Sequence, residues 1–379
     1  MKKQMKSLSL SKFSLAIAAF GLTLLIAETA AWIFFFVKEK PEYVYQYSYM
    51  NGYVYDPYIA FRMAHFPAFG NSAAMNSDSI VITGGSTAVG VGIQHIEKMY
   101  FTVLEQSLIH THHLPSVQIV NYGVPGFVSN QEAGAYKEYI FGKNIAPKLV
   151  ISFTSFNDLY FYLFRSLNVG NHEFSYAIDY VFRRGYPDPH SVIEQLRNWV
   201  RKTNLFAFQH YFRHREVNGI REPIRLSSDF QEPYQAKLEP TSEETILKAA
   251  NNFLDNCLAT GLLASKRGTR FVVLLQPNYF YGGELTISEN EWFKTIPDLQ
   301  KWIDSVGRQK PAYDKFYELV IKGLSRQKKE GILDFLDYRD KLKDAGPVFL
   351  DPVHFNSVGS KIVGESLASD LIKLNVFSR

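Results

Sequence analysis

From residue 78 onward, short apolar runs alternate with longer segments that have helical periodicity. The continuous apolar character of these runs is typical of parallel strands that are buried on both faces. The predicted strands are Ile80–Thr83, Val117–Asn121, Lys148–Phe153, Arg270–Leu275 and Ile332–Leu336. Helices are expected over residues 96–110, 129–141, 241–266 and 357–374. This alternation predicts an α/β fold with an open, doubly wound parallel sheet and helices on both of its faces.

The first predicted strand ends in Gly84-Gly85-Ser86. Two consecutive glycines favour a tight turn, and the serine hydroxyl then lies at the carboxyl end of the strand. In open α/β sheets this edge is where ligands bind. Taken alone, such a turn is more often structural than catalytic, so its meaning depends on the rest of the chain.

Complementary polar groups follow the other predicted strands. Gly123 comes after the second strand, Asn157 after the third, and Asp351 and His354 stand just before the last helix. A serine nucleophile needs a general base such as histidine, and the histidine needs an acceptor that orients its ring. An attacked ester carbonyl also needs hydrogen-bond donors for its developing negative charge. The backbone N–H groups of Ser86 and Gly123 and the amide of Asn157 are the candidate donors.

These stretches, in this order, resemble the four sequence blocks of the SGNH hydrolase superfamily, also called GDSL esterases or lipases. The resemblance extends over about residues 78–375 and implies a three-layer α/β/α domain of flavodoxin-like architecture. It implies that Ser86 is the nucleophile, His354 the base and Asp351 the residue that orients His354. It also implies an oxyanion hole formed by Ser86, Gly123 and Asn157, with neither a metal nor a cofactor.

Two positions depart from the family pattern. The first block is Gly-Gly-Ser-Thr rather than Gly-Asp-Ser, which resembles membrane-anchored envelope members more than secreted lipases. The third block has Ser155 where the family usually has glycine, and its side chain is expected to affect the geometry of the oxyanion hole.

Other sites that a Gly-rich turn can indicate are not supported. A Walker phosphate loop needs a lysine after its last glycine, but Val91 follows Gly90. The spaced glycines and later acidic residue of a dinucleotide site are absent from the sequence, and the Gly-x-Ser-x-Gly elbow fails because Ala88 holds its last place. The single cysteine, Cys257, is expected to be a buried helix residue rather than a nucleophile.

A histidine cluster at His110, His112 and His113 has no carboxylate at ligand spacing, so no metal site is predicted there. The formal net charge of +4 is too small to indicate a nucleic-acid partner. The composition therefore argues against nucleic-acid-binding proteins and excludes few other classes.

The N-terminus predicts a membrane anchor. Residues 1–12 contain four lysines, and the following residues 13–37 are almost wholly apolar. A helix of this length spans roughly 37 Å, enough to cross a bilayer with some tilt. The lysines favour a cytoplasmic N-terminus and place the remainder outside, periplasmic or extracellular. The alternative is a signal peptide cleaved near Ala31, which would release a secreted protein. Glu28 is the one costly residue within the span.

Two further regions have distinct compositions. Residues 38–77 are a tyrosine-rich connecting segment, in which the alternation from Tyr43 to Tyr49 predicts a strand, with a carbohydrate-stacking surface as the alternative. An insertion at about residues 160–240 is expected to be mainly helical and carries an excess of arginine. A lipid-headgroup or anionic-glycan contact is one hypothesis for that insertion. The hydrolase domain itself is assigned to residues 78–379.

The expected function is a serine esterase of the inner membrane that acts on O-acetyl or other O-acyl esters of envelope glycans. Two alternatives stay open on the sequence: an O-acyltransferase that uses the same triad with a sugar hydroxyl as acceptor, and a non-catalytic scaffold or binding module. If His354 is the base, activity is expected to fall on acidification, because a protonated imidazole cannot accept the serine proton.

Overall fold

The computed structural model describes residues 19, 21–31, 53–56, 60–63, 69–72, 75–93, 95–165, 242–286 and 299–377. The predicted strand at 43–49 and nearly all of the predicted insertion lie outside the described residues. Contacts divide the chain into two units, and the larger one comprises residues 52–186 and 222–379. Of the smaller unit, the described part is a helix over residues 21–31. Among the described residues, no helix combines the length and apolar character needed to span a membrane.

A five-stranded parallel sheet forms the centre of the larger unit, and it confirms the five predicted strands. Its spatial order is β4-β3-β5-β6-β8, which is the flavodoxin-like order 2-1-3-4-5 when counted along the chain. The strand bounds are β3 (Ser79–Gly84), β4 (Gln118–Asn121), β5 (Leu149–Thr154), β6 (Arg270–Leu275) and β8 (Asp334–Asp337). The central strand β3 pairs Ile80 with Ile119 of β4 on one side and with Leu149 of β5 on the other.

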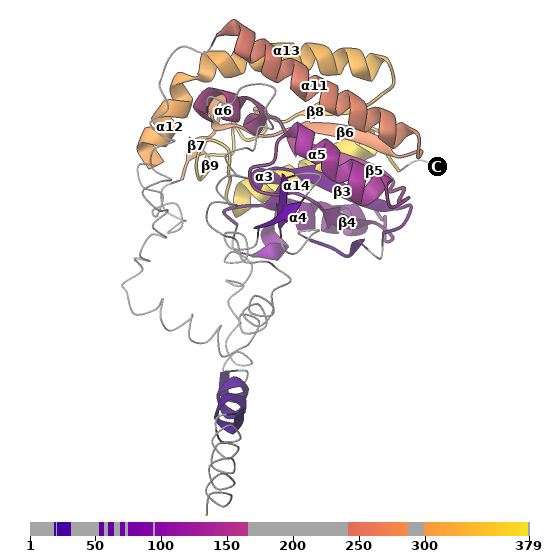
Figure 1. Cartoon of the computed structure of the whole chain (residues 1–379), viewed down its shortest axis with the longest axis vertical. Coiled ribbons are helices and arrows are strands. Elements are labelled where there is room, and N and C mark those ends of the chain that lie inside the picture. Colours follow the sequence, from indigo (N-terminus) through magenta and orange to yellow (C-terminus); the bar gives the residue numbers. More distant parts are fainter. Residues whose placement is uncertain are drawn as a thin grey trace, which may run out of the picture. The chain divides into compact units, whose positions relative to one another are not determined.

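Helices cover both faces of this sheet (Figure 1). One face is covered by α5 (Ser129–Tyr136), α6 (Phe156–Arg165), α11 (Glu243–Ser265) and α13 (Lys310–Lys329). The other is covered by α4 (Tyr100–Gln106) and α14 (Ser357–Lys373). This is the predicted three-layer α/β/α arrangement.

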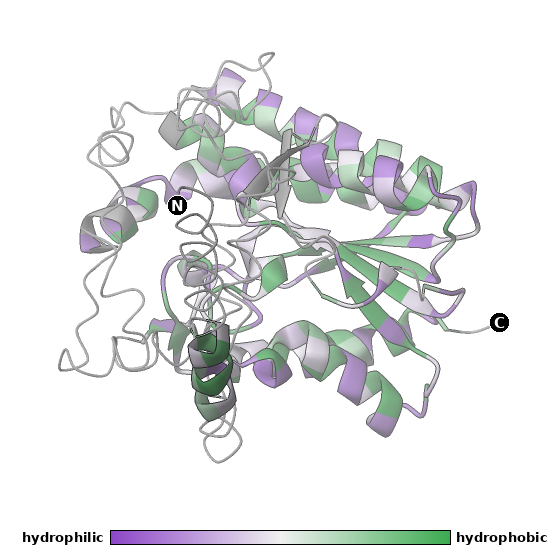
Figure 2. Ribbon diagram, turned by 60° about the horizontal axis from the view of Figure 1, so that its bottom comes forward, coloured by the Kyte–Doolittle hydropathy of each residue, from purple (hydrophilic) through white to green (hydrophobic). Residues whose placement is uncertain are grey.

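Two hydrophobic cores result from the alternation of side chains along each strand. Val81 and Val150 belong to the core under α5, α11 and α13. Their neighbours Ile82 and Ile151 belong to the core under α4 and α14. Figure 2 shows mainly hydrophobic strands between helices that carry both hydrophobic and hydrophilic residues. Because both sheet faces are buried, the strands read as continuous apolar runs.

Helix ends agree in part with the sequence. Ser242 is the N-cap of α11, and its Oγ accepts a hydrogen bond from the Thr245 N–H at 3.2 Å, as the Thr-Ser-Glu-Glu start predicts. The sequence predicts Ser129 or Asn130 as the cap of α5, but the structure has Val128 at the N-cap position. The Ser129 hydroxyl donates instead to Asp158 of α6. Cys257 is a buried residue of α11, as expected.

Several elements lie outside the predicted pattern. The helices α12 (Leu299–Arg308) and α13 follow one another, and α13 was not anticipated. Short helical segments are η2 (Ile96–Lys98), η3 (Ser107–Thr111), η4 (Lys137–Phe141) and η6 (Tyr279–Tyr281). Small strand pairs are the antiparallel β1 (Tyr53–Asp56) with β2 (Ala60–Met63), and the parallel β7 (Glu284–Leu285) with β9 (Pro347–Phe349). The predicted helices over 96–110 and 129–141 are therefore each divided, since η3 and η4 are π-helical extensions.

Candidate active site

The predicted site residues converge at the carboxyl edge of the sheet. Ser86 follows β3 and Asn157 follows β5, and these neighbouring strands mark the point where the strand order changes direction. The loop that carries Asp351 and His354 reaches this edge from the start of α14. Parallel pairing therefore brings together residues that are up to 268 positions apart in the chain.

Close backbone approach explains the two glycines before Ser86. Gly84 has φ +149°, and a Cβ atom there would lie 2.3 Å from the Phe153 carbonyl oxygen. A Cβ atom on Gly85 would lie 2.6 Å from Asn157 Nδ2. The turn leads directly into the short helix α3 (Ser86–Val89), in which Ser86 is the first residue. A side chain at either glycine would therefore separate β3 from the segment that carries Asn157.

Ser86, His354 and Asp351 form a continuous chain of hydrogen bonds. Ser86 Oγ lies 2.7 Å from His354 Nε2, and His354 Nδ1 lies 2.6 Å from Asp351 Oδ2. The side chain of Asp351 is 1% exposed and that of His354 is 12% exposed. With Nδ1–H donating to the ionised carboxylate, Nε2 is left to accept the serine proton.

Backbone groups fix the Asp351 carboxylate. Its Oδ1 accepts hydrogen bonds from the N–H groups of Val353 and His354, each at 2.8 Å. Its Oδ2 is then free to meet the imidazole ring. The three-residue spacing between Asp351 and His354 thus forms a local turn that sets the ring orientation.

The loop of His354 is also tied to the serine turn, by contacts that the sequence analysis did not identify. The hydroxyl of Thr87 donates to the Val353 carbonyl at 3.4 Å, and the Gln276 amide donates to the Thr87 hydroxyl, also at 3.4 Å. The Tyr279 N–H donates to the Pro352 carbonyl at 3.0 Å. Since Thr87 directly follows Ser86, it links the nucleophile turn to the base loop. A threonine next to the serine was the only signal in the sequence.

Two hydrogen-bond donors belong to the turn that carries Ser86 or lie beside it. The Ser86 N–H is the first of α3 and so has no acceptor within that helix. Asn157 Nδ2 donates one of its two hydrogens to the Phe127 carbonyl at 2.8 Å and retains the other. Its closeness to Gly85 places this amide beside the serine turn.

The structure differs from expectation at Gly123. The Gly123 N–H donates to Asn121 Oδ1 at 2.8 Å, while Asn121 Nδ2 donates to the Ala88 carbonyl at 2.7 Å. The single N–H hydrogen of Gly123 thus points at the buried side chain of Asn121. Three residues later, Gly126 has φ +86°, and no group in the described part of the chain accepts its N–H. Gly126 is the second glycine of the Gly-Val-Pro-Gly stretch, and its N–H was not among the donors predicted from the sequence.

Ser155, just after β5, has a backbone conformation that favours glycine. Its φ is +108°, a region that L-residues with side chains rarely adopt. The Ser155 hydroxyl lies 3.2 Å from the Tyr317 hydroxyl of α13, and both residues are buried. Burial raises the pKa of Tyr317 to about 12, so its hydroxyl stays protonated. The serine is therefore packed against α13.

A carboxylate holds the loop after β4 against α6. Asp158 Oδ1 accepts hydrogen bonds from the Ser129 N–H at 3.0 Å and from the Ser129 hydroxyl at 2.5 Å. The neighbouring Asn157 bonds the Phe127 carbonyl of the same loop. Asp158 is 4% exposed, so these bonds form away from water. The two segments that carry Gly126 and Asn157 are thereby joined at two points.

The three clustered histidines lie at the end of η3 and directly after it. His110 Nε2 lies 2.8 Å from Gln106 Oε1, and the neighbouring histidines are in the turn after η3. Within the described ranges, no group of three or more histidine, cysteine, aspartate or glutamate residues is placed to hold a metal ion.

No protein-family model and no curated protein matches this sequence. Among solved structures, the chain is similar to the acetyl xylan esterase AlAXEase, at 13% identity and TM-score 0.38, over 77% of this chain and 99% of that one. It is similar to a putative GDSL-like lipase from Parabacteroides merdae, at 12% identity and TM-score 0.40, over 78% and 97%. It is also similar to the lipase Lip_vut3 from a goat rumen metagenome, at 12% identity and TM-score 0.41, over 77% and 96%. At identities this low, the chemistry of this chain has to be inferred from its own residues.

Proposed function

We propose that this protein is a serine ester hydrolase in which Ser86, His354 and Asp351 form the catalytic triad. The observation that carries the proposal is the pair of short contacts from Ser86 Oγ to His354 Nε2 and from His354 Nδ1 to Asp351 Oδ2, at 2.7 and 2.6 Å. These distances lie within the range required of a nucleophile, its base and the group that orients the base. Because His354 and Ser86 are partly exposed, a substrate can reach these hydrogen-bonded side chains.

In the first half of the reaction, Ser86 Oγ attacks the carbonyl carbon of the ester while its proton passes to His354 Nε2. The tetrahedral intermediate then collapses, the bond to the leaving alcohol breaks, and His354 gives its proton to that alcohol. In the second half, water attacks the acyl-serine carbonyl carbon and passes a proton to His354, and this proton returns to Ser86 Oγ as the bond between the acyl group and the serine breaks. The products are a carboxylic acid, an alcohol and free Ser86.

The negative charge on the carbonyl oxygen needs donors that are in place before the reaction. The Ser86 N–H and the free hydrogen of Asn157 Nδ2 are two such donors. For the third we propose Gly126 in place of Gly123, because the Gly123 N–H already donates to Asn121. The loop that carries Gly126 is held to Asn157 through the Phe127 carbonyl.

Active-site labelling tests the enzyme proposal. Full-length protein in detergent is treated with a fluorophosphonate probe, and turnover of p-nitrophenyl acetate is measured in parallel. We expect wild type to be labelled at Ser86 and the Ser86→Ala variant to be neither labelled nor active. Ser369→Ala, which changes a half-buried serine of α14 whose hydroxyl bonds the Glu365 carbonyl, is the matched control and should behave as wild type. Wild type without labelling or turnover would contradict the proposal and favour a non-catalytic module.

The substrate we propose is an O-acetyl or other short acyl ester of an envelope glycan. It is supported by the Gly-Gly-Ser-Thr form of the first block and by the apolar N-terminal segment. Purified protein incubated with O-acetylated glycans is expected to release free carboxylate. If the acyl group appears instead on an added sugar acceptor, the protein is an O-acyltransferase that uses the same triad.

We also propose that residues 13–37 anchor the protein in the inner membrane, with the catalytic domain outside. The four preceding lysines and the length of the apolar run support this topology. The full-length protein should remain in membranes after alkaline carbonate extraction and become protease-accessible in spheroplasts. Recovery of a soluble protein that begins near Ala31 would contradict the anchor.

A further inference from the structure

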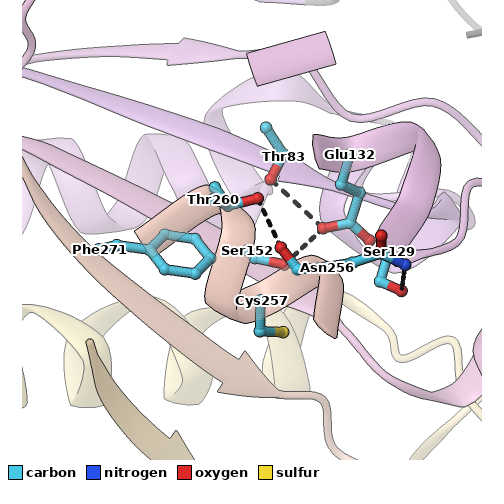
Figure 3. A pocket seen from close by; sticks show the side chains of 8 residues that line it. All are labelled: Thr83, Ser129, Glu132, Ser152, Asn256, Cys257, Thr260 and Phe271. Atoms are coloured by element: carbon cyan, nitrogen blue, oxygen red, sulfur yellow. Dashed lines mark hydrogen bonds between the residues drawn. The ribbon is translucent and has the colours of Figure 1, made fainter. Parts of the chain in front are cut away.

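A small polar pocket lies between α5, α11 and the sheet, under strands β3 and β5. It is lined by hydroxyl, amide and carboxyl groups, among them Thr83, Ser129, Glu132, Ser152, Asn256 and Thr260. The volume of this cavity, counted as the space open to the centre of a water molecule, is about 10 Å³. That is close to the minimum for one ordered water, provided that two to four polar partners surround it. Figure 3 shows the side chains around this space.

Glu132 is the unusual member of the pocket. It is 3% exposed, and its Oε2 accepts hydrogen bonds from the Ser152 hydroxyl at 2.5 Å and from the Thr83 hydroxyl at 3.3 Å (Figure 3). Its Oε1 is fully buried and has no hydrogen-bond partner among the described residues. Such an atom is costly unless something in the pocket meets it.

The neighbouring groups favour an uncharged carboxyl. Across the described ranges, Glu132 forms no ion pair with a lysine, arginine or histidine, and the groups that donate hydrogen bonds to it are hydroxyls. The titratable groups that interact electrostatically with Glu132 are Cys257 of α11 and Tyr100 of α4, and Asp158 of α6 interacts in the same way with Cys257; none of the three is cationic. Burial raises the pKa of Glu132, and hydrogen bonds from Ser152, Thr154 and Thr83 oppose this shift only in part. A buried carboxylate without a cation is more stable once it binds a proton.

The other side of the pocket supplies acceptors. Thr260 Oγ1 uses its hydrogen on the Asn256 carbonyl at 2.9 Å, so toward the pocket it can only accept. Asn256 Nδ2 donates to the Ser129 hydroxyl at 3.0 Å, which leaves its amide oxygen as a second acceptor. A molecule that accepts one hydrogen bond from Glu132 and donates two to these acceptors, as water can, would satisfy all three groups.

We propose that this pocket is a binding site for one ordered water, and that Glu132 meets it as a neutral carboxylic acid whose Oε1–H donates to the water. The water in turn donates toward Thr260 and Asn256. Glu132 thereby links α5 and α11 with strands β3 and β5, whose ends carry Ser86 and Asn157. This inference concerns stability and charge state, and it holds whether or not the protein is an esterase.

The sign of the pH effect follows from linkage. A carboxyl whose pKa is higher in the folded than in the unfolded protein contributes stability that is fully present below the unfolded pKa. That contribution is lost as the pH rises through the folded pKa. Glutamine imitates the neutral acid, since its amide oxygen can accept from Ser152 and Thr83 while its amide hydrogen donates to the water.

The test compares the melting temperatures of full-length wild type and Glu132→Gln between pH 4 and pH 9. We expect similar values at acidic pH, and an advantage for the variant that grows by about 2–4 °C per pH unit above pH 5 and then levels off. Glu365→Gln, which changes an exposed carboxylate of α14, should show no such divergence. A pH-independent difference for Glu132→Gln, or wild type gaining the advantage as pH rises, would overturn the neutral acid.

Two further measurements separate water from a bound cation. The infrared spectrum of wild type minus Glu132→Gln at pH 7 should contain the carbonyl band of a protonated carboxylic acid. The wild-type melting temperature should be the same in sodium, potassium and choline chloride at equal ionic strength. A sodium-specific stabilisation that Glu132→Gln abolishes would mean that an ionised Glu132 holds a cation, and the proposal would be wrong.

Discussion

Asp351 and Glu132 are both buried carboxyl groups that lie near the carboxyl edge of the same sheet, but their surroundings differ. Asp351 accepts two backbone N–H groups and faces the His354 ring, which becomes cationic during the proposed reaction. Glu132 accepts only hydroxyl hydrogen bonds, and all of these go to one oxygen.

This contrast in surroundings indicates that burial alone does not set the charge of a carboxyl group. Backbone donors with fixed positions and the His354 ring stabilise the anion at Asp351, whereas the donors to Glu132 are rotatable hydroxyls and the described residues give it no cation. The first arrangement suits a group that must stabilise an imidazolium, and the second suits a structural connection that carries no charge.

The largest expected effect is at the nucleophile. Ser86→Ala should lower kcat/KM by about 10⁴–10⁶-fold, because no other group can form the acyl intermediate. The free energy of unfolding should change little, since Ser86 is only half-buried. Steady-state kinetics with p-nitrophenyl acetate and a urea titration measure the two quantities. Substantial residual turnover by a pure preparation would place the nucleophile elsewhere.

The second-largest loss of activity is expected for Asp351→Asn, which tests directly whether the carboxyl groups of Asp351 and Glu132 differ in function. It should reduce kcat by about 10³–10⁴-fold, because an amide at this position favours the wrong ring tautomer of His354. Glu132→Gln, the same chemical change in the other pocket, should leave kcat within about threefold of wild type. Equal losses in the two variants would show that the two carboxyl groups are not different in kind.

Asn157→Ala should lower kcat by about 10²–10³-fold with a small change in KM, because the lost donor acts on charge that forms in the transition state. The measurement is kcat and KM for a series of short-chain esters. A rise in KM with constant kcat would instead place Asn157 in ground-state binding.

Asp158→Asn should have a smaller effect, a loss of about tenfold in kcat with KM unchanged. The amide weakens the clamp on Ser129 and so loosens the Phe127 loop relative to Asn157. Combining it with Asn157→Ala in a double-mutant cycle tests the coupling. Fully additive losses would mean that Asp158 does not act through the oxyanion hole.

The smallest effect is expected for Ser155→Gly, which removes backbone strain but also the hydrogen bond with Tyr317. Because a left-handed non-glycine residue costs about 1–3 kcal/mol and a neutral hydrogen bond contributes about 0.5–1.5 kcal/mol, the two changes nearly cancel. The free energy of unfolding, measured by urea titration, should shift by no more than about 1 kcal/mol. Ser155→Val, in contrast, should be strongly destabilising, since a β-branched residue is least tolerant of φ +108°.

Much of the fold could be predicted because its local signals agree with its tertiary structure. The strands are apolar runs for the simple reason that both faces of the sheet are covered, and Gly84 and Gly85 mark the turn after the first strand. The helix α13 was missed because its buried side chains, among them Tyr313 and Tyr317, are interleaved with many charged residues.

The candidate site was predicted in its residue types and less well in its contacts. Ser86, Asn157, Asp351 and His354 were recognised from their order and spacing, and the structure brings them to one edge. The choice between Gly123 and Gly126 depended on where an N–H group points, and Asn121 decides that direction. Spacing along the chain contains no such information.

Periodicity and local turn chemistry were enough to predict the α/β class, the five strands and the order of the chemistry-bearing groups. Which hydrogen bonds those groups make could be seen in the folded protein alone. The tertiary structure joined Thr87 to Val353, Ser155 to Tyr317 and Glu132 to Ser152 across long stretches of chain. The reason is physical: hydrogen-bond partners and charge states depend on which groups share a desolvated space, and that space exists only once the helices have packed on the sheet.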